Sequence, residues 1–245
     1  MAIQGQAVLA IWNGIQGDAE TEFLNWHVHE HIPERVALPG FRRGRRYVAL
    51  DGHPKFFNFY EADRPEDFTS DAYHAALNTP SPWTKAVVRH FTDTSRTVCR
   101  VLASWGCGEG ALVEAVRLSG GEATDAFLHR LADSVLPEIA ARPGVVGAHL
   151  LKGQGEMGRQ NTEETRLRGG PDAVADVIVL VELTDAAILS TLRASGPLCD
   201  DSLRAVGAEG EICRGVYALQ YSLSKDELPH LLQASAGQGN RKSMT

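Results

Sequence analysis

Long apolar stretches, a targeting leader and paired cysteines are all missing from this sequence. No run approaches the roughly 18 apolar residues of a membrane-spanning helix, so we expect no membrane partner. Residues 1–6 contain no basic region followed by an apolar one and do not resemble a signal peptide. The four cysteines, Cys99, Cys107, Cys199 and Cys213, form no CxxC pair, which is typical of a protein of the reducing cytoplasm.

Positive charge is also scarce. The chain has 24 Lys and Arg against 31 Asp and Glu, a net charge of −7, and this argues against a nucleic-acid partner because phosphate binding needs a basic surface. One basic cluster comprises Arg42, Arg43, Arg45 and Arg46. We expect these charges on an exposed strand edge, where they discourage pairing with other chains. The alternative is contact with an anionic substrate, with Arg46 as the first candidate.

Motifs for phosphate binding and for a serine nucleophile are missing as well. The glycine-rich residues 105–110 follow a predicted strand but lead into another strand, which is typical of a linker. No GxSxG motif occurs. Histidine remains as the most prominent chemical group: three of the nine histidines, His27, His29 and His31, lie in one short segment beside Glu30 and Glu34.

A second version of this segment, without its histidines, occurs later in the chain. Aligning Pro33 with Pro137 also aligns Glu34 with Glu138, and it aligns the Pro-Gly pairs at 39–40 and 143–144 without a gap. This repetition predicts two units of similar structure. Each unit has the predicted order strand, helix, strand, strand, helix, strand (βαββαβ), which is the ferredoxin-like pattern.

The expected elements follow that order in both units. In the first unit we expect strands at 7–12, 45–50, 56–60 and 97–104, and helices at 18–36 and 65–76, with a further turn at 85–90. In the second we expect strands at 112–118, 146–151, 177–182 and 216–223, and helices at 124–141 and 186–206. The units span 1–105 and 106–224, and a short helix and flexible tail occupy 225–245. The polar connection at 153–172 is predicted to be a mobile surface loop.

The predicted fold class is α+β. An open four-stranded sheet leaves one face without helices, and two such sheets in one chain can cover each other. We therefore expect two ferredoxin-like repeats packed sheet to sheet around a barrel-like core, with the helices outside. Such a chain is a monomeric pseudo-dimer or forms a homodimer.

The second unit indicates which face of the histidine-rich helix points inward. Its helix carries an apolar stripe at helical spacing, formed by Phe127, Leu128, Leu131, Val135, Leu136 and Ile139. His27 and His31 align with Leu131 and Val135, so both histidines should face the sheet. His29 and Glu30 align with polar residues and should lie nearer solvent. Two inward imidazoles need polar partners or a metal, which predicts a site.

Aromatic residues of the first unit are candidate walls for that site. Trp26 lies on the same helix, and Tyr47, Phe57 and Tyr60 lie on neighbouring strands. Because strand side chains alternate, Phe57 and Tyr60 should point to opposite faces of the sheet. Simple filling of the core is the alternative interpretation of these aromatics. An apolar pocket with a few polar groups is the usual form of a small-molecule site.

The segment from Trp26 through Glu30-His31-Ile32-Pro33-Glu34 to the Pro39-Gly40 turn and Arg46-Tyr47 resembles the dimeric α/β-barrel superfamily, and within it the EthD-like branch. The resemblance implies paired ferredoxin-like units, here fused in tandem, and it assigns the family histidine to His31. That superfamily includes isomerases, lyases, cyclases, cofactor-free monooxygenases and haem enzymes, as well as members without known activity. The resemblance therefore predicts the fold more sharply than the reaction.

The leading functional hypothesis is a cofactor-independent catabolic lyase, isomerase or cyclase acting on a small aromatic or unsaturated carbonyl compound. His31, with His27 and Glu30, would perform acid–base catalysis at a pKa near neutrality. The substrate-binding candidates are Trp26, Glu34, Arg46, Tyr47, Phe57 and Tyr60. A divalent metal at His27 and His31, four residues apart, is an alternative, and haem is a weaker one. A non-catalytic small-molecule-binding or oligomer-forming module is the remaining alternative.

Overall fold

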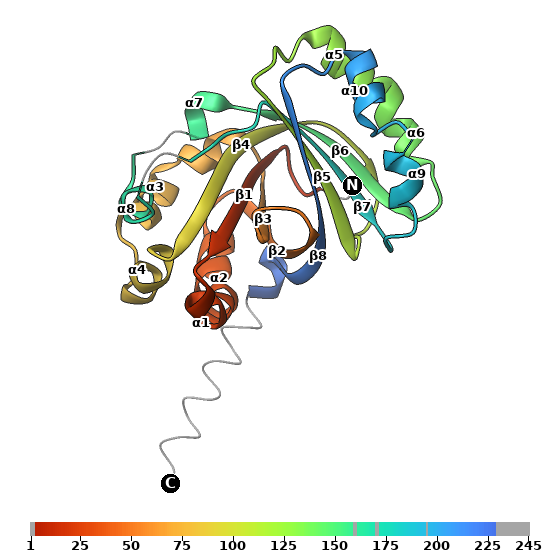
Figure 1. Cartoon of the computed structure of the whole chain (residues 1–245). Coiled ribbons are helices and arrows are strands. Elements are labelled where there is room, and N and C mark those ends of the chain that lie inside the picture. The colour runs from red at the N-terminus through yellow and green to blue at the C-terminus, as the bar shows by residue number, and fades with distance from the viewer. Residues whose placement is uncertain (1–2, 159–160, 170–171, 195, 229–245) are drawn as a thin grey trace.

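The computed structural model describes residues 3–158, 161–169, 172–194 and 196–228. The chain is an α+β protein built around a closed, antiparallel barrel of eight strands, with helices packed on its outside (Figure 1). Most helices of the second half lie on the side of the barrel opposite those of the first half, but the two short helices at 155–158 and 163–167 lie on the first half's side. No helix in these described ranges is both long and apolar enough to cross a membrane.

Two four-stranded sheets form the barrel. Their strands are β1 (Ala7–Ile15), β2 (Phe41–Asp51), β3 (Phe56–Ala62), β4 (Phe91–Gly106), β5 (Leu112–Ser119), β6 (Val145–Gly153), β7 (Val177–Leu183) and β8 (Glu211–Ser224). The first half has the order β4-β1-β3-β2 and the second has β8-β5-β7-β6, which is the ferredoxin-like order in each case. The sheets join where β2 pairs with β8 and β6 pairs with β4. The predicted fold class and strand order are therefore confirmed.

The helices follow the predicted positions, in shorter pieces. The first half contains α1 (Glu20–Trp26), α2 (Ile32–Ala37), α3 (Asp71–Asn78) and α4 (Pro82–Val88). The second contains α5 (Asp125–Arg130), α6 (Leu136–Ala140), α7 (Gly155–Gly158), α8 (Glu163–Leu167), α9 (Leu189–Arg193) and α10 (Asp200–Val206). Of the helix expected at 225–232, Lys225–Glu227 form a single 3₁₀ turn, and residues from 229 onward lie outside the described ranges.

A π turn interrupts the first long helix of each half at the matching place. It spans His27–His31 between α1 and α2, and Leu131–Val135 between α5 and α6. In each turn the residue before the proline donates its N–H to a carbonyl five positions back instead of four. Pro33 and Pro137 explain the turns, because proline lacks an N–H and its ring collides with the carbonyl four residues earlier. The origin of the two halves by tandem duplication stays a prediction.

Buried aromatic and charged side chains fill the inside of the barrel. Trp12 stacks on Phe57, with ring centroids 4.4 Å apart. Towards one end, Arg45 is within hydrogen-bonding distance of Glu61 (2.7 Å) and Glu182 (3.0 Å), and all three side chains are almost completely buried. Burial alone would raise the pKa of Glu182, but His149 and Arg45 beside it hold that pKa at about 2.

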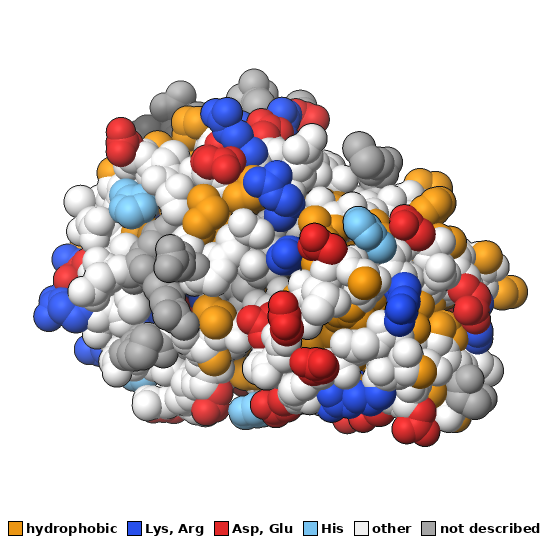
Figure 2. Space-filling model, turned by 90° about the horizontal axis from the view of Figure 1, so that it is seen from above, with side chains coloured by type: hydrophobic (Ala, Val, Ile, Leu, Met, Phe, Trp, Pro, Cys, Tyr) orange, Lys and Arg blue, Asp and Glu red, His pale blue; other side chains and the backbone are white. Residues whose placement is uncertain are grey.

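The arginine cluster thus lies elsewhere than predicted. Arg43, Arg45 and Arg46 are buried, and only Arg42 is exposed. The strand-edge interpretation is wrong because β2 has no free edge: β3 covers one side of it and β8 the other. On the outer surface, Figure 2 shows acidic and basic side chains interspersed over the viewed face, without a continuous basic area.

Candidate functional site

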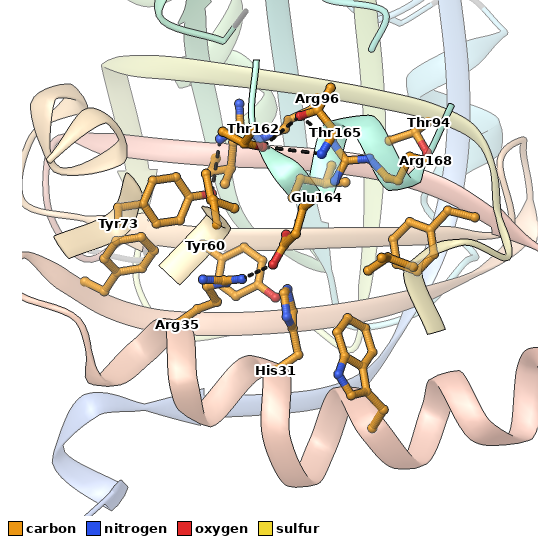
Figure 3. Close-up of a pocket in the computed structure, with 17 residues that line it drawn as sticks. His31, Arg35, Tyr60, Tyr73, Thr94, Arg96, Thr162, Glu164, Thr165 and Arg168 are labelled. Atoms are coloured by element: carbon orange, nitrogen blue, oxygen red, sulfur yellow. Dashed lines mark hydrogen bonds and ion pairs between the residues drawn. The ribbon is translucent and has the colours of Figure 1, made fainter. Parts of the chain in front are cut away.

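A cavity of about 40 Å³ lies on the outside of the barrel in the first half (Figure 3). Its walls come from the helix α1–α2, the outer faces of β1, β3 and β4, and helices α3 and α4. The connection between β6 and β7, which belongs to the second half, covers it with residues 162–168. Most of the lining is apolar or aromatic: Leu9, Ile11, Trp26, Phe41, Tyr60, Tyr73, Leu77, Val88 and Phe91. A space of this volume has room for only a few water molecules, so a larger ligand needs the cover to shift.

The two inward histidines differ in their surroundings. His27 is 2% exposed and does not line the cavity. Its Nε2 lies 3.3 Å from the Tyr60 hydroxyl, and its ring stacks on Phe23 at 5.1 Å. His31 lines the cavity, packs 4.3 Å from the Trp26 ring, and has an Nδ1 without a hydrogen-bond partner among the described residues. The sequence comparison correctly placed both rings inward, but only His31 reaches the cavity.

Burial holds both imidazoles in the neutral form. It lowers the pKa of His27 well below 6.5, and the nearby Arg46 guanidinium lowers it further. The pKa of His31 is also well below 6.5, first because of burial and then because Arg35, His27 and Arg168 are close. The expected pKa near neutrality is therefore wrong. At pH 7 His31 is a neutral base, facing the cavity and already deprotonated.

An ion pair joins the floor of the cavity to its cover. Arg35 of α2 binds Glu164 of α8 through Nη2 and Oε1, and each residue is 3% exposed. Figure 3 shows Glu164 reaching down from the cover to Arg35, with His31 beside it. The Arg35 guanidinium also lies 5.7 Å from the centre of the Tyr73 ring. The connection that we predicted to be a mobile surface loop is thus, in this part, a buried wall.

The two glutamates beside the histidines lie away from the cavity. Glu30 accepts hydrogen bonds from Trp26 Nε1 (3.2 Å), Ser81 Oγ (2.5 Å) and Thr84 Oγ1 (2.9 Å), which attach the start of α4 to the π turn. Glu34 is exposed and contributes nothing to the cavity lining. Neither carboxylate is placed to polarise the His31 ring. Glu30 instead positions Trp26, which does line the cavity.

Three of the predicted substrate-binding residues are separated from the cavity. Arg46 donates to Gln220 Oε1 (3.1 Å) and to the Leu24 carbonyl (3.2 Å), and lies behind His27. Tyr47 and Phe57 lie inside the barrel, on the opposite face of the sheet. Tyr60 takes the outer face, as alternation along β3 predicted. The structure therefore brings together His31, Trp26 and Tyr60, and not the full predicted set.

The sequence reasoning missed the basic residues of the cavity, which are Arg35, Arg96 and Arg168. Arg96 donates to the Tyr73 hydroxyl at 3.1 Å, and Arg168 to Asp172 at 2.8 Å. One signal was available: Arg35 aligns with the buried Ile139 of the second half, and an inward arginine requires a partner. The length of the β6–β7 connection was a second signal for a covering segment.

Metal ligands do not gather around the two histidines. The described part of the chain contains no group of three or more His, Cys, Asp or Glu side chains arranged to hold an ion. The Nε2 atom of another histidine, His53, lies 3.6 Å from Asp93 Oδ2. The four cysteines are free, with Cys99 buried and Cys107 exposed.

No protein-family model and no curated protein matches the sequence. Among solved structures, an anthrone oxidase-like protein has a TM-score of 0.60 at 16% identity, over 89% of this chain and 92% of that chain. A protein of Fusobacterium nucleatum subsp. nucleatum, assigned as a monooxygenase, has a TM-score of 0.55 at 10% identity, over 91% and 96%. An assigned chlorite dismutase has a TM-score of 0.50 at 15% identity, over 94% and 100%.

Identities this low establish the fold alone, and the more specific EthD-like resemblance remains a prediction. The similarity covers both halves, and it agrees with the closed eight-strand barrel and with the ferredoxin-like strand order of each half. The chain therefore has the dimeric α/β-barrel fold, with both ferredoxin-like units of the pair in one polypeptide.

Proposed function

We propose that the chain is an enzyme that removes a proton from a small aromatic or unsaturated carbonyl compound, with His31 as the general base. The observation that carries this proposal is the His31 Nδ1 atom, which has no hydrogen-bond partner among the residues that the structure describes and belongs to a ring at the wall of an aromatic cavity. A general base must be deprotonated at the working pH and within reach of its substrate. The lowered pKa of His31 meets the first condition, and its place in the lining supports the second.

The surroundings of His31 favour formation of a substrate anion. Proton transfer from a carbon next to a carbonyl leaves an enolate, and positive groups in a buried site stabilise such a charge strongly. Arg35 and Arg168 both lie close enough to His31 to lower its pKa, so they are within electrostatic reach of that charge. Trp26, Tyr60 and Tyr73 supply aromatic surface for an unsaturated substrate.

Several reactions begin with such an anion. Reprotonation at another atom gives an isomerase, and loss of a leaving group gives a lyase. Reaction of the anion with O₂ gives an oxidation, which the anthrone oxidase-like and assigned monooxygenase structures bring into consideration. Anthrone is a suitable probe, because anthrone and O₂ give anthraquinone and water with all atoms balanced, and the first step is removal of a C–H proton.

We further propose that the reaction needs no metal or haem. For a metal, the support is that His27 Nε2 faces Tyr60 and that the described residues offer no third ligand near His31. For haem, it is the cavity beside His31, which at about 40 Å³ is far smaller than a porphyrin. Metal analysis of untagged protein and its visible absorption spectrum test this proposal. One equivalent of metal, or a haem absorption band that persists through purification, would contradict it.

The test of the base compares His31→Val with His29→Asn. Valine is the residue at the matching position 135 of the second half, so it suits this helix, and His29 is an exposed histidine in the same turn. Two rates are measured: deuterium exchange at the acidic carbon of anthrone without O₂, and anthraquinone formation with O₂. We expect His31→Val to lose at least about a hundredfold in both rates, the usual contribution of a general base. His29→Asn should match the unmodified protein.

Equal rates in His31→Val and the unmodified protein would refute the role of His31. Circular dichroism of each variant shows whether the fold is retained. If the unmodified protein catalyses neither reaction, a panel of enolisable phenols and 1,3-dicarbonyl compounds extends the exchange assay. Failure of every compound to exchange would favour the non-catalytic binding module.

A further inference from the structure

Two buried arginine nitrogens in the cavity lack a hydrogen-bond acceptor. Arg35 Nη1 and Arg168 Nε have no hydrogen-bond partner among the described residues. Both side chains are nevertheless buried: that of Arg35 is 3% exposed and that of Arg168 is 10% exposed. An unsatisfied N–H of a charged group is costly in a buried place. Two of them at one cavity indicate that a ligand supplies the missing acceptors.

Each of these guanidinium groups uses only some of its N–H donors. Arg35 uses Nη2 to bind Glu164, and Arg168 uses Nη2 to bind Asp172. A carboxylate presents two oxygens with several acceptor positions, and arginine binds this planar group better than any other. The charge of the lining is consistent with such a ligand: it contains Arg35, Arg96 and Arg168, and Glu164 is its only acidic residue in the described ranges.

We propose that the substrate of this site carries a carboxylate, which Arg35 and Arg168 bind, and that it takes the place of Glu164 on Arg35. This assignment rests on the proposed function, and it names the class of substrate as an aromatic carboxylate. Aromatic surface is provided by Trp26 and Tyr73, in the same cavity as the two arginines. Figure 3 shows Arg168 on the cover and Arg35 on the helix below, with Glu164 between the two levels.

Exchange of the Glu164 carboxylate for that of the ligand also explains how a ligand can enter the closed cavity. The cavity of about 40 Å³ is too small for an aromatic ring, so α8 and its neighbours must shift when a ligand enters. A neutral ligand would separate Arg35 from Glu164 and leave a buried charge without compensation. An anionic ligand compensates Arg35 as it enters, and the displaced Glu164 carboxylate moves out with α8 and is compensated by water. This difference makes the site selective for anions.

Isothermal titration with benzoate and with its neutral isostere benzamide tests the assignment without any turnover. We expect benzoate to bind the unmodified protein and benzamide to bind at least tenfold more weakly. Arg168→Gln should weaken benzoate binding roughly tenfold or more, as loss of a charged hydrogen bond does. Arg166→Gln is the matched control, because Arg166 lies on the same helix, is exposed and pairs with Glu163.

Glu164→Gln should change the affinity for benzoate in the direction opposite to Arg168→Gln. It keeps the shape of the side chain but removes the charge that competes with the ligand for Arg35, so benzoate should bind more tightly than to the unmodified protein. A variant that merely damaged the fold would weaken binding. Opposite effects of Glu164→Gln and Arg168→Gln are therefore specific to the proposed exchange.

Three results would overturn the assignment. They are equal affinity for benzoate and benzamide, equal benzoate affinity in Arg168→Gln and Arg166→Gln, and no benzoate binding at all. None of these depends on His31. Equal turnover of anthrone and of a carboxylated anthrone, with both rates lost in His31→Val, would leave the proposed function in place and remove the carboxylate. Benzoate binding together with unchanged turnover in His31→Val would leave the carboxylate in place and remove the proposed base.

Discussion

Replacing the two inward histidines by the residues of the second half should make the protein more resistant to acid. The change is His27→Leu with His31→Val, which copies Leu131 and Val135. Both histidines have a folded-state pKa well below 6.5, whereas in the unfolded chain the pKa returns to about 6.5. The unfolded state therefore binds more protons below pH 6.5, and the stability of the folded state falls as the pH drops through that value.

The size of the effect follows from this difference. Each of the two histidines costs about 1.4 kcal/mol of stability for every pH unit below 6.5, until its own folded pKa is reached. Between pH 7.5 and pH 5 the cost is therefore at most about 2 kcal/mol for each histidine and about 4 kcal/mol for both, the limit reached when the folded pKa lies below this range. With a urea m-value of roughly 3 kcal/mol/M, the acid shift of the unfolding midpoint should be smaller by up to about 1.3 M in the double variant.

Urea unfolding followed by tryptophan fluorescence at pH 7.5 and pH 5 measures the shift. Carboxylates and other titrating groups contribute equally to both proteins, so the difference between the two shifts isolates the histidines. His29→Asn is the control, since His29 is exposed and should leave the acid shift unchanged. An acid shift in the double variant as large as in the unmodified protein would refute the reasoning. At pH 7.5 the double variant should have nearly the same free energy of unfolding as the unmodified protein. Removing a buried Nδ1 without a partner is favourable, and this gain offsets the loss of the hydrogen bond between His27 and the Tyr60 hydroxyl.

Three further changes should act through packing and buried charge. Gly44→Ala places a methyl group 2.9 Å from Ile32 Cγ2, so it should push the helix from the sheet and cost about 1–3 kcal/mol, measured by urea unfolding. Arg45→Met leaves Glu61 buried with one cation fewer and should cost roughly 3–5 kcal/mol; a thermal midpoint equal to that of the unmodified protein would contradict this. Leu131→His buries a polar ring in an apolar cluster, so it should lower stability by about 1–3 kcal/mol and create no second active site in the deuterium-exchange assay.

The sequence was informative wherever two parts of the chain could be compared. Aligning the halves placed His27 and His31 on the inward face, and the structure confirms this, because His27 is buried and His31 lines the cavity. Alternation along β3 likewise separated Phe57 from Tyr60. These predictions succeeded because the period of a helix or strand is a local property of the chain.

The failures concern contacts between distant segments. Arg43 and Arg45 read as surface charges, because their partners Glu61 and Glu182 are brought to them only when the barrel closes. Tyr47 was grouped with the histidines because it is close in sequence, yet the strand turns it to the other face. The partnership of Arg35 with Glu164 joins two halves of the chain, and no local pattern identifies such a partner.

The pairing of β2 with β8 has a consequence for the order of events during synthesis. Strand β2 is complete at Asp51, but its partner, β8, begins only at Glu211. A nascent chain can pair β2 with β3 early but must leave the other edge of β2 unpaired while most of the remaining polypeptide is made, and contacts so distant in sequence make folding slow. The exposed edge of β2 is a point for association with other chains during that time. A chain that stopped before β8 would keep this edge permanently, so we expect premature termination to give aggregation instead of a smaller active protein.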